Sequence, residues 1–374
     1  MQKIIRACTV PQSLDFVSGM IPDLTKRYEV VLLSSPGDNW AGIKRKYPEV
    51  KGIEVPMKRH ISPRKDIVSL WRIYKVFRKE KPQMVHSMTP KAGLLCMIAA
   101  WLARVPVRVH TFTGLVFPTA TGLKKRILMF TDWLTCACAT HIIPEGEGVK
   151  RDLLSNGITK KPIKVLGFGN VKGIDLEKFN PENEYISPKE ATKDTFNFIA
   201  VGRLVSDKGI NELVEAFVKL NKEYPDTRLI LVGPEEKELD PLTPDTLKQI
   251  KEHQAISAVG NQSDVRPWFA AANVAVLASY REGFPNVVIE AGAMGLPQIV
   301  TNINGANEII VDGKNGTIIP PRDTDAIYIA MKRMREDDTF RSFCAANARE
   351  MIASRYEQGF VRKCLYEFYD EVCK

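Results

Sequence analysis

The stretch that decides the fold is FNFIAVGRLVSDKG, residues 196–209. Its first half, Phe196–Val201, is a mostly apolar run, which is typical of a strand buried on both faces of a sheet. Its second half, Gly202–Gly209, is a turn bounded by glycines, and the amphipathic pattern of a helix follows over Ile210–Lys222. A buried strand that turns tightly into a helix is the building unit of a doubly wound parallel sheet.

The same alternation of strand and helix runs along all 374 residues. Near the start, the strand-like run Lys3–Val10 precedes a helical pattern over Ser13–Tyr28. Later in that half, an amphipathic pattern over Pro63–Glu80 and the strand-like run Val107–Thr111 repeat the scheme. Continuous apolar strands between amphipathic helices predict parallel sheets covered on both faces.

A polar segment divides the chain into two parts. Phe179–Asp194 contains two prolines and starts no periodic pattern, so it indicates an interdomain linker. The sequence therefore predicts an α/β protein with two Rossmann-like domains, residues 1–185 and 195–357, which face each other across a cleft. Ligands are expected at the carboxyl ends of their strands.

Composition narrows the class of protein. Apolar content of 44% and charged content of 26% are those of a globular protein. No signal peptide is expected from the residues that follow Met1, and the longest apolar run, Ala92–Ala103, is too short to span a bilayer. Seven scattered cysteines without a C-x-x-C pair indicate reduced thiols in a cytoplasmic protein. No zinc pattern or magnesium-binding carboxylate cluster is present, so no metal is expected.

The positive charge is concentrated in the first half of the chain. Residues 1–180 contain 30 Lys and Arg against 14 Asp and Glu, whereas the whole chain has a net charge of +9. The densest basic run, Lys58–Lys65, leads into the basic amphipathic pattern over Pro63–Glu80. Nucleic-acid binding is a possible function of this basic run, but the run contains no nucleic-acid recognition motif. The pattern fits either a solvated helix or a helix that binds an anionic membrane surface.

Two carboxylates, Glu282 and Glu290, stand on either side of a predicted helix start. Gly283 and Pro285 break regular structure, and Val287–Met294 is expected to form a buried helix. A helix N-terminus attracts anions, and carboxylates bind sugar hydroxyls. One ligand with hydroxyls at both ends and phosphates between them, a nucleotide sugar, suits this arrangement.

A pair of carboxylates is also what a glycosidase uses. A glycosidase needs the two groups less than about 10 Å apart, whereas eight helical positions separate Cα atoms by about 12 Å. This spacing disfavours a hydrolase. Both glutamates could instead be ordinary surface residues, but the intervening Gly-Phe-Pro-Asn argues against that alternative.

Other candidate residues lie at predicted strand ends. Arg203 and Lys208 bracket the turn after Phe196–Val201, where they could grip a pyrophosphate from two sides. His110 could donate to a sugar hydroxyl or to a leaving phosphate, although a core histidine is the commoner outcome. Ser13 is a candidate cap for the first helix. The loop Asn304–Glu308 either lines the same site or simply caps a helix.

Five segments together resemble a known family: Glu282–Glu290, Gly202–Gly209, Gly305–Gly316, Val109–Gly114 and Gly167–Asp175. They are similar to the retaining glycosyltransferases of family 4, which have the GT-B fold. The first-domain segments resemble those of bacterial members that build surface polysaccharides on a lipid carrier. The resemblance covers most of the chain and is more specific in the second domain.

The resemblance implies residue roles. Arg203 and Lys208 would hold the donor pyrophosphate, Glu290 the ribose hydroxyls, and Glu282 the transferred sugar. Backbone groups between Glu282 and Glu290 would bind sugar and phosphate, and the helix after Ser13 would add N–H groups for the phosphates. The residues concerned between the two glutamates are Gly283, Phe284, Pro285, Asn286 and Val287.

Two departures from the family pattern stand in the first domain. Many relatives carry a glycine pair where this chain has Pro11–Ser13, and many have a histidine where Thr113 stands. Either His110 or Thr113 is therefore the residue that contacts the transferred sugar. The resemblance also implies that the final helix, about residues 358–374, crosses back to the first domain.

The implied reaction is a metal-independent transfer, with retention of configuration, of a hexose or N-acetylhexosamine from a UDP-linked sugar. The implied acceptor is a polyprenyl-pyrophosphate-linked saccharide, reached from the cytoplasmic face of the inner membrane. A nucleotide-sugar epimerase of the same architecture and a non-catalytic sugar-nucleotide-binding protein are the alternatives. An exported solute-binding protein would need a signal peptide.

Overall fold

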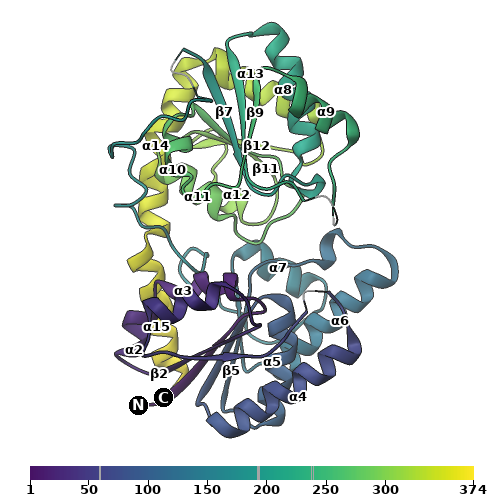
Figure 1. Ribbon diagram of the computed structural model, residues 1–374, viewed down its shortest axis with the longest axis vertical. Coiled ribbons are helices and arrows are strands. Elements are labelled where there is room, and N and C mark those ends of the chain that lie inside the picture. Colours follow the sequence, from purple (N-terminus) through teal and green to yellow (C-terminus); the bar gives the residue numbers. More distant parts are fainter. Residues whose placement is uncertain (59, 192–193, 237, 239) are drawn as a thin grey trace. The chain divides into compact units, whose positions relative to one another are not determined.

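The computed structural model describes residues 1–58, 60–191, 194–236, 238 and 240–374. The chain divides into two compact units, Met1–Gly173 with Gly359–Lys374, and Ile174–Gln358. We call them unit 1 and unit 2 (Figure 1). The last residues of the chain thus belong to the unit that contains the first.

Unit 1 is built on a six-stranded parallel sheet with the order β3-β2-β1-β4-β5-β6. The first strand is central, because Ile5 pairs with Val31 on one side and with Val85 on the other. Its neighbours are short and apolar, as strands covered on both faces are. The strands are β1 (Lys3–Ala7), β2 (Glu29–Ser34), β3 (Lys51–Glu54), β4 (Met84–Met88), β5 (Val107–Phe112) and β6 (His141–Pro144).

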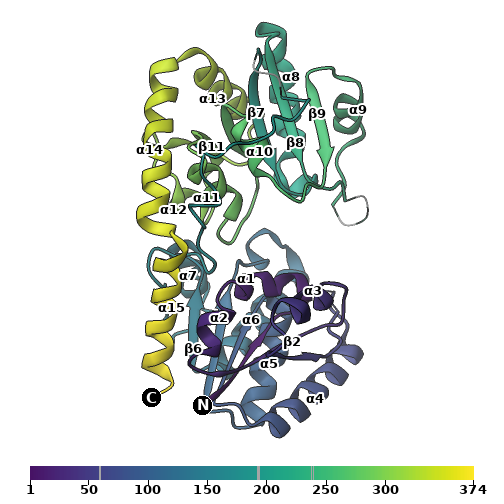
Figure 2. The ribbon, with the colours of Figure 1, turned by 60° about the vertical axis from the view of Figure 1, so that its left-hand side comes forward.

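Helices cover both faces of this sheet, as Figure 2 also shows. Ile5 and Ala7 of β1 pack in one core and Ile4 and Cys8 in the other, because successive strand residues point to opposite faces. The first face carries α4 (Pro63–Glu80), α5 (Pro90–Leu102), α6 (Gly122–Cys138) and α7 (Glu147–Ser155). The opposite face carries η1 (Pro11–Leu14), α1 (Asp15–Ser18), α2 (Ile21–Thr25), α3 (Asn39–Lys46) and α15 (Gln358–Val372).

The first helix of unit 1 differs from its prediction. The expected single helix over Ser13–Tyr28 is wrong: the structure has the 3₁₀ turn η1 and two short helices, α1 and α2. Gly19 follows the last residue of α1, and Pro22 stands at the start of α2. Proline is tolerated at a helix start but not in a helix interior, so one continuous helix could not form.

Unit 2 repeats the architecture with six parallel strands in the order β12-β11-β10-β7-β8-β9. In both sheets the first strand of the unit, β1 or β7, is central. Its neighbour on one side is the fourth strand of the same unit, β4 or β10. The two predicted doubly wound sheets are confirmed. The strands are β7 (Phe196–Val201), β8 (Thr227–Val232), β9 (Ile256–Gly260), β10 (Val274–Leu277), β11 (Gln298–Thr301) and β12 (Gly316–Ile319).

Two layers of helices sandwich the sheet of unit 2. Phe198 and Ala200 of β7 face one core and Ile199 faces the other. The first layer contains α8 (Ile210–Glu223), α9 (Pro244–Glu252) and α13 (Thr324–Glu336). The second contains α10 (Arg266–Ala270), α11 (Asn286–Ala293), α12 (Ala306–Ile309) and α14 (Asp338–Tyr356).

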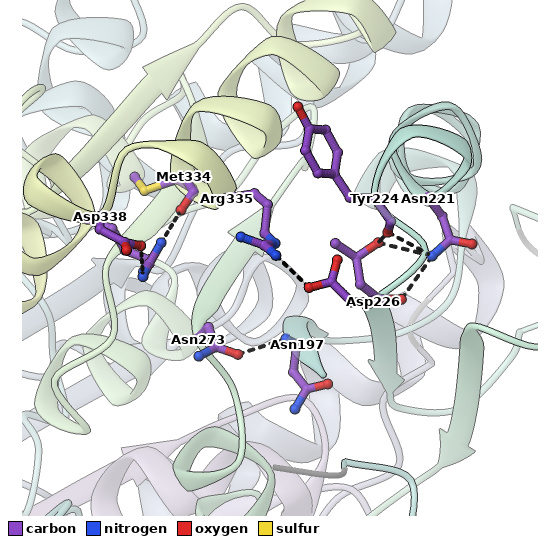
Figure 3. Close-up of polar contacts among 10 residues, drawn as sticks. Asn197, Asn221, Tyr224, Asp226, Asn273, Met334, Arg335 and Asp338 are labelled. Carbon is purple, nitrogen blue, oxygen red and sulfur yellow. Dashed lines mark hydrogen bonds and ion pairs between the residues drawn. The ribbon is translucent and has the colours of Figure 1, made fainter. Parts of the chain in front are cut away.

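Side chains form hydrogen bonds and an ion pair at the amino ends of the strands in the sheet of unit 2 (Figure 3). Arg335 Nη2 lies 2.5 Å from Asp226 Oδ2 and ties α13 to the residue before β8. The side-chain amide of Asn221 donates to the backbone oxygen of Thr227 at 2.9 Å, and the backbone N–H of Asn197 donates to the side-chain oxygen of Asn273 at 2.7 Å. These contacts stabilise the sheet at the amino ends of its strands, opposite their carboxyl ends.

The two units divide between Gly173 and Ile174, so the described residues of the polar segment Phe179–Asp194 are grouped with unit 2. Phe179 and Tyr185 pack against apolar clusters of unit 2. The Arg349 guanidinium donates to the backbone oxygens of Leu176 at 2.8 Å and Phe179 at 2.5 Å. Residues 192–193 of this segment, and Arg59 of the basic run, lie outside the described residues.

Within the ranges that the structure describes, no helix combines the length and the apolar character needed to cross a membrane.

Candidate functional site

The two central strands of unit 2, β7 and β10, are adjacent, and their following helices leave toward opposite sides of the sheet. Such a switch point leaves a crevice at the strand ends in doubly wound folds. Gly209, which follows β7, has φ +65°, and a Cβ there would lie 2.1 Å from the backbone oxygen of Ala278. Only glycine allows the turns after β7 and β10 to approach this closely.

A cation and a carboxylate meet at this switch point. Lys208, in the turn after β7, forms an ion pair with Glu282, in the loop after β10. The hydroxyl of Ser279 donates to the same carboxylate oxygen, Glu282 Oε1, at 2.9 Å. The side chains of Lys208 and Glu282 are only 21% and 17% exposed. Two predicted site residues are thus held together in a partly desolvated place, where charge interactions are strengthened.

A second layer of polar contacts holds the two loops behind this pair. Arg281 Nη2 lies 2.9 Å from Asp207 Oδ2, and the backbone N–H of Asp207 donates to Asp240 Oδ2 at 2.6 Å. The hydroxyl of Tyr280 donates to Glu212 Oε1 at 2.5 Å. Burial, which is the larger cause, and the hydrogen bond to this carboxylate both raise the pKa of Tyr280. Sequence reasoning missed Ser279, Tyr280 and Arg281, although they directly follow β10 and the strand-end rule covers them.

Arg203 does not join the Lys208–Glu282 pair. It forms an ion pair with Glu236, which follows β8, and its side chain is 48% exposed. The backbone N–H of Leu204 donates to the backbone oxygen of Pro234 at 2.8 Å and holds this turn beside the loop after β8. The two cations predicted to grip one pyrophosphate therefore each have a carboxylate partner of their own.

Helix α11 begins directly after the Glu282 loop. It spans Asn286–Ala293, within one residue of the prediction at each end, and its N-cap residue is Pro285, whose side chain has no acceptor. Glu290 lies one turn into the helix and is partly buried. Because Gly283–Pro285 is a loop, the helical estimate of the distance between Glu282 and Glu290 does not apply.

The third predicted loop packs onto the Glu282 loop. Gly305 has φ +76°, and a Cβ there would lie 2.5 Å from the backbone oxygen of Gly283. The backbone N–H of Gly305 also donates to Glu308 Oε1 at 3.1 Å, which caps α12. The loop therefore combines both expected roles, because it caps a helix and also adjoins the site.

This arrangement can bind a ligand that carries both phosphate and hydroxyl groups. The N-terminus of the eight-residue helix α11 and the Lys208 ammonium favour anionic oxygens. The carboxylates of Glu282 and Glu290 are acceptors for hydroxyl groups. All four features belong to unit 2.

His110 is a core residue of unit 1. It is 1% exposed, its Nδ1 lies 2.9 Å from Ser87 Oγ, and its ring meets Phe112 edge-on at 4.5 Å. Burial lowers the pKa of His110 to about 3, so the ring is neutral at physiological pH. Thr113 directly follows β5 and is partly exposed, so the structure leaves Thr113 as the accessible member of the pair.

Ser13 does not act as the predicted helix cap. It lies inside η1, where its backbone N–H donates to the backbone oxygen of Val10 at 3.0 Å. The N-cap residues of η1 and α1 are Val10 and Leu14, and neither makes a side-chain capping bond. The cause is the 3₁₀ turn that begins at Pro11, which places Ser13 within a turn instead of before a helix.

The switch point of unit 1 is occupied by two threonines. Thr9, after β1, and Thr89, after β4, have hydroxyls 2.7 Å apart. The hydroxyl of Thr9 also accepts from the backbone N–H of Ala92 at 3.1 Å, in the first turn of α5. Thr89 has φ +70°, a conformation that costs free energy in a β-branched residue. Sequence reasoning missed this pair.

Across the described ranges of the chain, no group of three or more His, Cys, Asp or Glu side chains is arranged to hold a metal ion.

Two family models match the two halves of the chain. The model of the glycosyl transferases group 1 matches residues 182–351, and that of the glycosyl transferase 4-like domain matches residues 16–169. The stretch between the two matches, residues 170–181, contains the division between the two units.

Similar proteins share most of their length with this chain. It is 33% identical to the capsular polysaccharide biosynthesis glycosyltransferase CapM of Staphylococcus aureus, over 100% of this chain and 98% of that protein. It is 31% identical to a UDP-Gal:α-D-GlcNAc-diphosphoundecaprenol α-1,3-galactosyltransferase of Escherichia coli, over 82% of this chain and 80% of that protein. The crystal structure of HepE from Anabaena with UDP and glucose has the same fold, with a TM-score of 0.78 and 17% identity over 99% of this chain and 100% of HepE.

Proposed function

This chain belongs to glycosyltransferase family 4 and is an enzyme of surface-polysaccharide biosynthesis, and from that premise we propose that it moves a hexose or N-acetylhexosamine from a UDP-linked sugar to a saccharide carried on a lipid pyrophosphate. The observation that carries the proposal is the Lys208–Glu282 ion pair at the switch point of unit 2. It sets a cation for phosphate beside a carboxylate for sugar hydroxyls, directly ahead of the N-terminus of α11.

In the proposed donor complex, Lys208 and Arg203 offset the charge of the leaving diphosphate. Glu282 accepts hydrogen bonds from the transferred sugar and Glu290 from the ribose. The backbone of Gly283–Val287 contacts sugar and phosphate. For Arg203 this requires exchange of Glu236 for a phosphate, which its half-exposed position permits.

The proposed chemistry retains the configuration at the anomeric carbon by a front-face displacement. The bond from the anomeric carbon to the phosphate oxygen breaks while the acceptor oxygen bonds on the same face. The departing phosphate takes the proton of the acceptor hydroxyl, so the step requires neither a protein base nor a metal ion. Stabilisation of the leaving group by fixed charges is then the main contribution of the protein.

In unit 1, we propose that Thr113 rather than His110 contacts the transferred sugar. The buried, neutral ring of His110 is already hydrogen-bonded to Ser87. Thr113 is accessible at the end of β5. The turn η1, which follows β1 and contains Ser13, is the proposed contact of unit 1 with the donor phosphates.

The proposed acceptor and location follow from the relatives and from charge. The name of the E. coli relative specifies a saccharide on diphosphoundecaprenol as its acceptor. The first 180 residues of this chain are strongly basic, which favours an anionic membrane surface. We place the enzyme at the cytoplasmic face of the inner membrane, as a peripheral protein.

The proposal is tested by two assays on the full chain. Thermal stabilisation by a panel of nucleotide sugars identifies the donor, and transfer to a polyprenyl-pyrophosphate saccharide tests the reaction, with retention read from the product by NMR. Conversion of the donor without acceptor would identify an epimerase instead. Binding without any turnover would identify a non-catalytic protein. Transfer that stops after chelation with EDTA would contradict the metal-independent step.

A further inference from the structure

Three neighbouring helices of unit 1 carry large apolar side chains that point to solvent. Helices α4, α5 and α6 cover one face of the sheet and share one core (Figures 1 and 2). Leu123 is 73% exposed, Ile67 67% and Phe130 59%. We call the whole set the outer apolar patch: Ile67, Val68 and Trp71 on α4, Trp101 and Leu102 on α5, and Leu123, Ile127, Phe130 and Trp133 on α6.

Aromatic rings of the patch stack within α6 and within α4. Phe130 and Trp133 stack with ring centroids 5.7 Å apart, and Trp71 stacks on Tyr74 at 5.2 Å. Lys75 lies 5.4 Å from the centroid of the Trp71 ring. Exposed large apolar side chains that gather on neighbouring helices mark an interaction site. Tryptophan beside basic residues is the composition of surfaces that lie in a membrane interface.

The surroundings of the patch are strongly cationic. The exposed basic residues on and beside the three helices are Lys58, Arg64, Lys65, Arg72, Lys75, Arg78, Lys79, Lys81, Arg104, Lys124 and Arg126.

The three helices carry three acidic residues, and none of them opposes this charge effectively. Asp66 pairs with Lys91 at 2.6 Å, and Glu80 pairs with Lys3 and Lys51. Burial raises the pKa of Asp132 to about 7, so it carries only part of a charge near neutral pH. A second copy of the chain on this face would bring the two cationic surfaces together. The charge therefore favours an anionic partner.

We infer that the α4–α5–α6 face docks on an anionic lipid bilayer, with the outer apolar patch inserted among the headgroups and the basic side chains on lipid phosphates. The inference rests on the proposed function in one respect: a lipid-linked acceptor gives the enzyme a reason to reach the membrane. It goes beyond general attraction of a basic domain, because it assigns the contact to named apolar residues. Part of the binding should then survive high salt, since apolar insertion is not screened.

The test is co-sedimentation of the full chain with phosphatidylglycerol-rich and phosphatidylcholine vesicles. Wild type should bind the anionic vesicles. Phe130→Ser with Trp133→Ser should weaken that binding about tenfold or more, at low and high salt alike. Phe343→Ser is the matched control, because Phe343 is 53% exposed on α14 of unit 2. If the double variant misfolds, Leu123→Ser, at the most exposed residue of the patch, replaces it.

A second pair of variants separates charge from insertion. Lys124→Glu with Arg126→Glu should weaken binding at low salt about tenfold or more and change the binding at high salt little. Lys248→Glu with Lys251→Glu makes the same charge change on α9 and should leave binding unchanged at both salt concentrations. Binding that is unchanged in the patch variant overturns the inference. So does wild-type self-association, measured by sedimentation velocity, that the patch variant abolishes.

Failure of docking and failure of the proposed function give different results. Transfer to a water-soluble acceptor analogue needs no bilayer, so the patch variant should retain it. If the patch variant binds vesicles as well as wild type does and transfer is intact, only docking is refuted. Patch-dependent vesicle binding with no transfer to any acceptor refutes the proposed function alone.

Discussion

Units 1 and 2 place their first and fourth strands side by side but have different chemistry at that shared topological position. At the switch point of unit 2, Lys208 and Glu282 form a charged pair beside the start of α11. At the switch point of unit 1, the hydroxyls of Thr9 and Thr89 form a hydrogen bond, and the Thr9 hydroxyl also accepts from the first turn of α5. The fold thus supplies the switch point twice, and the residues at it differ: unit 2 presents a cation beside a carboxylate, whereas unit 1 presents neutral hydroxyls.

The largest expected effect breaks the charged switch point. Lys208→Ala should lower kcat/KM for transfer by about 10²–10³-fold, because the leaving diphosphate loses a fixed positive charge. Lys219→Ala is the control, since Lys219 forms an exposed ion pair with Asp325 in the same unit. Steady-state kinetics with the identified donor measure both. Near-normal turnover of Lys208→Ala would remove the basis of the proposed function.

The next effect tests how closely the two turns of unit 2 must approach. Gly209→Ala should lower the free energy of unfolding by about 3 kcal/mol, because its Cβ would overlap the backbone of Ala278 and its φ is +65°. Gly157→Ala in unit 1 has φ +68° but nothing within 4 Å, so it should cost only about 1 kcal/mol. Urea denaturation compares them. Equal losses would mean that the close approach is unimportant.

The neutral state of His110 in unit 1 can be tested through pH. The pKa of His110 is about 3 in the folded chain, below its unfolded value of about 6.5. Between those values the unfolded chain binds the extra proton, so stability should fall on acidification by about 1.4 kcal/mol per pH unit for this residue. His110→Gln should show a shallower fall in urea denaturation from pH 6.5 to 4. A transfer profile that loses a step near pH 6.5 in this variant would instead make His110 an acid or base in catalysis.

The smallest effect concerns the partner of Arg203. Glu236→Gln should lower the donor KM about two- to threefold, because the guanidinium no longer has to leave a carboxylate to reach phosphate. The pair is partly exposed, which limits the gain. Glu235→Gln, at the exposed neighbouring residue, should leave KM unchanged. An increase in KM for Glu236→Gln would mean that Glu236 positions Arg203 rather than competing for it.

Local patterns predicted most of unit 2. The apolar run Phe196–Val201, the glycine turn and the bounds of α11 needed only strand and helix periodicity. The pairing of Lys208 with Glu282 did not follow from either segment, because it depends on β7 and β10 being neighbours in the sheet. The same strand-end rule would have found Ser279, Tyr280 and Arg281 had it been applied to every residue after β10.

Unit 1 was harder to predict for two physical reasons. Proline and glycine broke the first helix, although the apolar spacing over Ser13–Tyr28 favoured a continuous one. Burial settled the role of His110, and burial of a strand-end side chain depends on packing from α5, where Gly93 leaves room for the ring. The outer apolar patch was likewise hidden, since sequence alone does not tell which apolar residues of α4 and α6 face outward.

The last helix of the chain has a consequence for synthesis on the ribosome. Tyr369 of α15 receives a hydrogen bond from the buried guanidinium of Arg6 at 2.5 Å, and its hydroxyl lies 2.6 Å from His86 Nδ1. Unit 2 is one continuous segment, so it can be synthesised completely before Tyr369 is available to Arg6 and His86. Unit 1 is completed only when residues 359–374 have emerged, so a nascent chain that lacks them leaves Arg6 without Tyr369 and uncovers the part of the sheet face on which α15 packs.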